Sequence, residues 1–471
     1  MKNSKLHTLL QTLSNKEWRE LDRFVRSPYF NRNAEVVRLW DLLREQIREL
    51  NIIPEKEWLY RRLYPEALAF DDQQLRLLMS YLFQLAEDFL IRQEQEVDKM
   101  RSFAVLTAQY RKRQLPRHFT KAWDQARKVR EQHPYRNADY FQEAYRLEME
   151  HYRFQAASNR IQEFNLQEVA DSLDTVFISQ KLRQACSMLS HQAVYKTDYD
   201  FGLLEPVLAY VETRNLLSLP AISVYYHCYR ALTQPEEDRY FREFKNLILS
   251  WTGLFPPDEM RDLFTLGINY CIRRYNQGGD AYLEDEFELY REGLSRGILL
   301  SEEGQLSRFT YRNAVTLGIV RKEYAWVERF LYDYRHALPP VHRESMFSFC
   351  LALLEYSRKE FKKALDLLQK TEYDDLLLNL AAKTVQLKIF YEWGASELLY
   401  AHLEAMHTFI LRKKIIGYHR ENYLNTIQMT RRLLEIGPSD RRALQVLRQE
   451  IEQTPNLAEK AWLLAQIGVG N

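Results

Sequence analysis

A pattern of apolar positions recurs at one fixed spacing in the second half of the chain. A glutamate followed by a large apolar residue stands at 286–287, 323–324, 360–361 and 397–398, so successive pairs are 37 residues apart. Positions five residues before, and three and seven residues after, each apolar member are apolar or small. Offsets of three and seven lie on one face of a helix. A unit that repeats at this length is typical of a helical solenoid.

Each unit of this pattern predicts two consecutive helices with Phe361 and its equivalents in the core between them. The predicted pairs are clearest at about 341–357 with 359–370, and at about 374–393 with 395–412. Further pieces at about 417–436, 439–452 and 456–467, with breaks at Gly437-Pro438 and Pro455, are expected to cover the last apolar face.

The N-terminal part carries helix-start signals of its own. Ser14 and Glu17 form a capping-box pattern, and Asn33 and Asp71 each precede an apolar-periodic run. Pro54 suits the first position of a short helix. Between Met100 and about Tyr195 the pattern predicts three or four further helices with breaks near Pro116 and Pro134, the last of them unusually long.

Two family resemblances follow from these stretches. The segment YSRKEFKKALDLLQK (356–370) resembles the second half of a tetratricopeptide repeat, with Phe361 and Ala364 at the aromatic and small positions. Leu351-Ala352 match the Leu-Gly pair of the first helix, but the spacing is 37 rather than about 34 residues and the closing proline is missing. The stretches LSNKEWRELDRFVRSPYFN and RKEYAWVERFLYDY are similar to those of an uncharacterised bacterial helical-repeat family with no known function.

These resemblances imply an all-α fold, namely a right-handed α-solenoid of tetratricopeptide-like helix pairs preceded by a small N-terminal helical module. A chain of 471 residues is long enough for several such parts. We expect the N-terminal module at 1–98, connecting helices at 99–199, the solenoid at 200–436 and capping helices at 437–471.

Composition agrees with a nearly all-helical chain, because glycine and proline number only 14 each and 28% of the residues are charged. Lysine and arginine total 66 against 65 aspartates and glutamates, so no global charge draws the protein to nucleic acid or membrane. No apolar run predicts a secretory signal or a membrane span. The four cysteines lie far apart in apolar helical contexts, as reduced thiols would. We therefore expect a cytoplasmic protein.

Motifs for catalysis, cofactors and metals are missing from the sequence. Gly278-Gly279 precede acidic residues and do not form a phosphate-binding loop. His402 and His407 are five residues apart, which places them about 140° apart around a helix and unsuited to share a metal. His227 and Cys228 are adjacent, so on a helix they point to different faces. The sequence predicts no enzyme activity, no cofactor and no metal.

One segment, residues 111–136, is strongly basic, with nine lysines and arginines against two acids and with interleaved aromatics. Basic and aromatic side chains together can contact phosphates and stack on bases. The alternative interpretation is a solvated helix face beside core aromatics. The candidate contact residues are Arg111, Lys112, Arg113, Arg117, Lys121, Trp123, Arg127 and Lys128.

The function that the sequence favours is a non-catalytic scaffold that binds a peptide or helix of a partner protein in the concave groove of the solenoid. The tetratricopeptide register places polar side chains along that groove, at Arg312, Asn313, Thr316, Lys383 and Gln386. Nucleic-acid binding through 111–136 is the second hypothesis. Self-association through some of the thirty tyrosines is the third. The sequence names no partner, pathway or oligomeric state.

Overall fold

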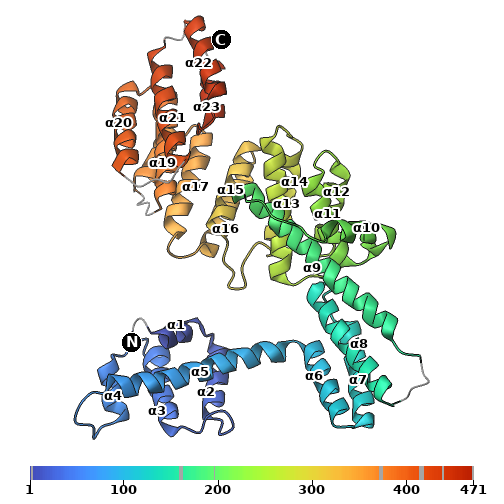
Figure 1. Cartoon of the computed structure of the whole chain (residues 1–471). Helices are drawn as coiled ribbons and strands as arrows, with labels where there is room; N and C mark the ends of the chain where they lie inside the picture. The colour runs from blue at the N-terminus through green and yellow to red at the C-terminus, as the bar shows by residue number, and fades with distance from the viewer. Residues whose placement is uncertain are drawn as a thin grey trace. The chain divides into compact units, whose positions relative to one another are not determined.

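The computed structural model describes residues 1, 4–158, 163–195, 197–370, 375–412, 418–436 and 440–468. These residues form 23 α-helices, one π-helical turn and two 3-10 turns (Figure 1). Their one β-type contact is an isolated antiparallel bridge between Leu300 and Leu306 in a loop. The prediction of an all-α protein is confirmed for this part of the chain. The predicted break at Gly437-Pro438 lies outside the described residues.

Contacts between Cα atoms divide the chain into two compact units. The first comprises Met1–Gln184 with Gly202–Ser223, and the second comprises Ala185–Phe201 with Val224–Asn471. The border therefore runs within the long helix α9 (Leu166–Tyr195) and within α11 (Pro220–Thr233). The division into four segments drawn from the sequence stays a prediction.

The first unit begins with helices whose starts follow local capping chemistry. The Ser14 side chain accepts from the Glu17 backbone N–H while the Glu17 carboxylate accepts from the Ser14 N–H, so the predicted capping box is present. The Asn33 and Asp71 side chains accept from backbone N–H groups in the first turns of the next predicted helices. The short helix begins two residues after Pro54, which makes the predicted position of that proline wrong. The helices are α1 (Lys5–Thr12), α2 (Asn15–Arg26), α3 (Ala34–Leu43), α4 (Lys56–Leu63) and α5 (Asp72–Val97).

These five helices enclose one hydrophobic core, in which the Trp18 and Trp40 rings stack with centroids 5.1 Å apart. A separate core forms among the next helices, where the Phe119 and Phe154 rings stack at 3.9 Å. Pro116 occupies the first turn of its helix, where its missing N–H costs no hydrogen bond. The helices of this second group are α6 (Lys99–Lys112), α7 (Pro116–Gln132) and α8 (Ala138–Ser158), and α9 and α10 (Leu204–Thr213) follow.

In the second unit, consecutive helices pack as pairs. The pairs are α13 with α14, α15 with α16, α17 with α18, and α19 with α20; in addition, α15 contacts α17 and α17 contacts α19. The bounds are α12 (Asp238–Ser250), α13 (Pro257–Asn276), α14 (Tyr282–Ser295), α15 (Arg308–Val320), α16 (Tyr324–Asp333), α17 (Arg343–Ser357), α18 (Phe361–Lys370), α19 (Leu376–Glu392), α20 (Ser396–Arg412), α21 (Tyr418–Glu435), α22 (Arg441–Gln453) and α23 (Lys460–Gly468).

The turn inside each of these four pairs contains one residue with left-handed backbone. These residues are Gly278, Lys322, Lys359 and Gly394, with φ angles of 95°, 60°, 64° and 70°. They lie 44, 37 and 35 residues apart. The spacing of 37 residues therefore holds for one interval between turns and fails for the two others.

The predicted buried stripe is present in the first three units and shifted in the fourth. Three and seven residues after the apolar member, the first three units have buried side chains: Tyr290, Val327 and Ala364, then Leu294, Leu331 and Leu368. In the fourth unit the predicted register is wrong, since Leu398 is 57% exposed and Ala401 and Ala405 are exposed. The turn of the fourth unit lies further from the apolar member: Gly394 precedes Leu398 by four residues, whereas Lys359 precedes Phe361 by two. The buried residues of α20 are Leu399, Leu403, Met406 and Ile410.

Candidate functional site

Helix α15 leaves one face exposed, and three of the residues predicted to bind a partner lie on it. Arg312, Asn313 and Thr316 are exposed, and Phe309 and Val320 on the same face are 65% and 45% exposed. The Arg312 guanidinium lies 5.4 Å from the centre of the Phe349 ring in α17. This contact holds a cation beside the exposed apolar side chains of α15.

The two predicted binding residues on α19 have different surroundings. Lys383 and Gln386 are half-buried. The Lys383 ammonium lies 5.3 Å from the Phe409 ring centre, and its carbonyl oxygen is 2.8 Å from His402 Nε2. Both partners belong to α20, so Lys383 faces the second helix of its own pair. The structure therefore surrounds Lys383 with protein, whereas it leaves Arg312, Asn313 and Thr316 accessible.

A cluster that sequence reasoning missed joins α17, α19 and α23 around the Glu392 carboxylate. This carboxylate accepts hydrogen bonds from the Tyr356 hydroxyl, from Lys359 Nζ at 2.5 Å and from Trp462 Nε1 at 2.9 Å. Burial raises the pKa of Glu392, but the bonds from Lys359, Tyr356 and Trp462 outweigh it and lower the pKa overall. Trp462 is 70 residues from Glu392, and no short-range pattern could have connected them.

The basic segment 111–136 contains two arginines that are paired with glutamates and six basic residues that are exposed to solvent. Arg111 Nε donates to Glu150 at 2.7 Å and Arg130 donates to Glu148 at 2.6 Å. Trp123 is only 9% exposed, because its ring stacks on His151 at 4.3 Å with an interplanar angle of 8°. The remaining predicted contact residues are exposed on or beside α7: Lys112, Arg113, Arg117, Lys121, Arg127 and Lys128.

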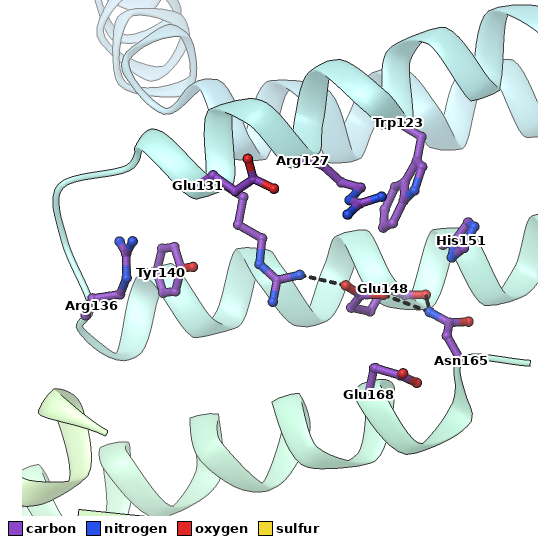
Figure 2. Close-up of a pocket in the computed structure, with 10 residues that line it drawn as sticks. Trp123, Arg127, Glu131, Arg136, Tyr140, Glu148, His151, Asn165 and Glu168 are labelled. Carbon is purple, nitrogen blue, oxygen red and sulfur yellow. Dashed lines mark hydrogen bonds and ion pairs between the residues drawn. The ribbon is translucent and has the colours of Figure 1, made fainter. Parts of the chain in front are cut away.

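A hollow of about 620 Å³ lies beside this segment, between α7, α8 and the start of α9 (Figure 2). Glu148 is central to it, accepting from Arg130 and, at 2.8 Å, from the Asn165 side-chain amide. Burial lowers the pKa of His151, so its ring is less readily protonated than in solution. The lining contains three arginines (Arg127, Arg130 and Arg136) and three glutamates (Glu131, Glu148 and Glu168). Its charges balance, so the hollow does not attract ligands of one sign.

The cysteine thiols of the described chain lie in the hydrophobic core. All four cysteines are buried, and burial raises the pKa of the Cys350 thiol to about 12. A thiol that stays protonated at neutral pH is a weak nucleophile. Within the described ranges, no group of histidine, cysteine, aspartate and glutamate side chains is arranged to hold a metal ion. None of the described helices is long and apolar enough to cross a membrane.

Comparison with known proteins gave no relative: no protein-family model, no curated protein and no solved structure matches this chain.

Proposed function

We propose that this protein is a non-catalytic scaffold that binds a peptide or helix of a partner protein. Its second unit acts as a right-handed, tetratricopeptide-like solenoid, preceded by a separate N-terminal helical module. The contacts of α15 with α17 and of α17 with α19 support this, because first helices that touch successive first helices are expected of a solenoid.

The observation that carries the proposal is the open face of α15, formed by Phe309, Arg312, Asn313, Thr316 and Val320. These positions are three, four, seven and eleven residues after the first, so they follow one stripe of the helix. There the apolar Phe309 and Val320 flank the Arg312 guanidinium, the Asn313 amide and Thr316, whose hydroxyl donates to the Arg312 carbonyl at 3.0 Å. Such a surface can cover an apolar side chain of a peptide while it donates hydrogen bonds to carbonyl or carboxylate oxygens.

Nucleic-acid binding through 111–136 is less well supported. Base stacking needs an exposed ring, and Trp123 is covered by His151. The charges of Arg111 and Arg130 are already paired with glutamates. Asp124 also stands between Lys121 and Lys128 on the exposed side of α7. We therefore favour the protein-binding function.

Selection from a random peptide display library on the full chain tests the proposal. We expect selected peptides to lose at least about tenfold in affinity when Arg312, Asn313 and Thr316 are all replaced by alanine. A matched control replaces the exposed Lys362 and Asp366 of α18 with alanine and should leave binding unchanged. Peptides that bind the triple variant and the native chain equally well would refute the proposed surface.

A further inference from the structure

Helix α23 lies in a groove with two chemically different walls. One wall belongs to α19 and presents Lys388, Tyr391 and Glu392, of which Tyr391 packs its ring edge-on against Trp462 at 5.4 Å. The other wall belongs to α21 and α22 and is apolar, made by Met429, Leu433, Leu447 and Ile451. Helices α21, α22 and α23 are direct neighbours (Figure 1).

Four side chains of the C-terminal segment reach these walls. Leu463 and Ile467 are buried in the apolar cluster, Trp462 donates to Glu392, and Glu459 forms an ion pair with Lys388. Leu463 and Ile467, four residues apart, lie on one face of α23 with Trp462 beside them, and Glu459 directly precedes the helix. This is the spacing by which an amphipathic helix fits a groove.

Glu459 has an unfavourable backbone conformation, with φ of 59°. Glycine or asparagine adopts left-handed backbone more readily than glutamate does. The Glu459 carboxylate forms an ion pair with Lys388, whose side chain is only 14% exposed. This ion pair accounts for a glutamate at a position that favours glycine. Polar pairing therefore opposes backbone strain at the point where α23 begins, so disruption of one ion pair favours release of the helix.

The groove is close to the proposed peptide-binding face of α15. Burial raises the pKa of the Tyr423 hydroxyl at the start of α21, the Arg312 guanidinium lowers it and the Glu459 carboxylate raises it. Both charges therefore act on one tyrosine. Arg312 belongs to the open face of α15 and Glu459 to the segment that fills the groove.

We propose that the groove occupied by α23 is an exchangeable helix-docking site. Its partner is a helix of another protein that carries a glutamate, a tryptophan three residues later, and apolar residues four and eight positions after the glutamate. In the free protein α23 fills the groove itself. This inference rests on the proposed scaffold function and names the kind of partner helix that the scaffold accepts.

Binding of a synthetic peptide with the sequence of residues 455–468 tests the proposal. The labelled peptide is titrated into the native chain and into the full-length variant Glu459→Lys, in which two cations face each other at Lys388. We expect at least about tenfold tighter binding to the variant, because its own helix leaves the groove more easily. Equal binding to the two chains, with circular dichroism showing both folded, would overturn the proposal.

Charge reversal provides the matched control. The double variant Lys388→Glu with Glu459→Lys restores the ion pair within the chain, and we expect it to bind the native peptide as weakly as the unmodified protein does. The single variant Lys388→Glu should instead bind a peptide that carries lysine in place of the glutamate. If α23 has a purely structural role, peptide affinity will not depend on which partner carries the lysine and which the glutamate. Affinities that are the same for all charge combinations would overturn the proposal.

Light scattering tests whether a second copy of this chain occupies the groove. If the native chain dimerises and Glu459→Lys abolishes the dimer, a second copy of this protein fills the groove and the assignment to a different partner fails. The scaffold function has its own outcome, because the library peptides are scored on Arg312, Asn313 and Thr316. If the library peptides bind and the 455–468 peptide does not, the scaffold function stands and the docking site is refuted. The reverse result refutes the α15 surface and supports the docking site.

Discussion

Lys322 and Lys359 occupy the same place in successive helix pairs, 37 residues apart, and both have left-handed backbone with φ angles of 60° and 64°. In the neighbouring turns the equivalent residues are glycines, Gly278 and Gly394. A side chain in this conformation crowds the backbone, whereas glycine does not. The turn is thus a fixed element of the pair, and its geometry is retained even where the residue is unfavourable.

Replacing the turn glycine and replacing the turn lysine should change the free energy of unfolding in opposite directions. Gly394→Ala should lower the free energy of unfolding by about 1 kcal/mol or more, because alanine is strained at φ of 70°. Lys322→Gly should be neutral or should stabilise by up to about 1 kcal/mol. Gly253→Ala is the control, since no atom lies within 4 Å of the added carbon and no left-handed angle is present. Urea denaturation measures all three; a destabilising Lys322→Gly would contradict the explanation.

Local chemistry explains which features could be predicted from the sequence. Ser14, Asn33 and Asp71 cap their helices through bonds to residues two or three positions away, and such bonds are visible in the sequence. The breaks at Pro116 and near Pro134 were found for the same reason.

Features that depend on distant residues could not be predicted. The 37-residue pattern assumed equal units, but the turn spacing of 35 residues shifts the stripe of the fourth unit by two positions. A shift of two residues rotates a helix face by about 200°, which is why Ala401 became exposed. Glu392 and Trp462 meet only because α23 folds back onto α19. Of the candidate site, the face of α15 was predicted and the groove of α23 was missed.

Phe361 is less buried than the sequence predicts. The sequence places it in the core, but it is the first residue of α18 and is half-buried, with its ring 6.4 Å from that of the exposed Trp393. Phe349 in α17 is 1% exposed. We expect Phe349→Ala to cost about 3–5 kcal/mol of stability and Phe361→Ala roughly half of that. Urea denaturation compares them, and equal losses would contradict the burial difference.

Glu286 should make stability depend on pH in an unusual direction. Burial raises the pKa of this carboxyl from 4.5 to about 7. The folded protein therefore holds this proton more tightly than the unfolded chain does. Its contribution is greatest below pH 4.5 and falls by about 1.4 kcal/mol per pH unit until the pH passes about 7.

Glu286→Gln removes this dependence, because the amide stays neutral. We expect the variant to exceed the native protein in stability at pH 8 by roughly 2–3 kcal/mol, and to match it near pH 4.5. The control Glu302→Gln changes an exposed carboxylate and should not alter the pH profile. Melting temperatures measured from pH 4.5 to 8 provide the test. Parallel curves for the native protein and Glu286→Gln would contradict the raised pKa of the Glu286 carboxyl.

The Arg111–Glu150 pair should be the stabilising part of the basic segment. Glu150 also accepts from Arg153 at 2.7 Å, and burial, which raises its pKa, is outweighed by bonds from Arg111 and Arg153 that lower it. Glu150→Gln leaves Arg111, which is 23% exposed, without its counter-charge. We expect a loss of about 2–3 kcal/mol, less than for a wholly buried pair.

The lowered pKa of Glu150 also fixes the pH range of this effect. The contribution is fully present above the unfolded value of 4.5 and is lost as the pH falls through the lower, folded value. Native protein and Glu150→Gln should therefore differ most near pH 7 and converge in acid. The exposed Glu131 on α7 supplies the comparison, since Glu131→Gln should leave stability unchanged. If Glu131→Gln and Glu150→Gln destabilise equally, the ion pair with Arg111 contributes nothing beyond surface charge, and the segment is a solvated helix face throughout.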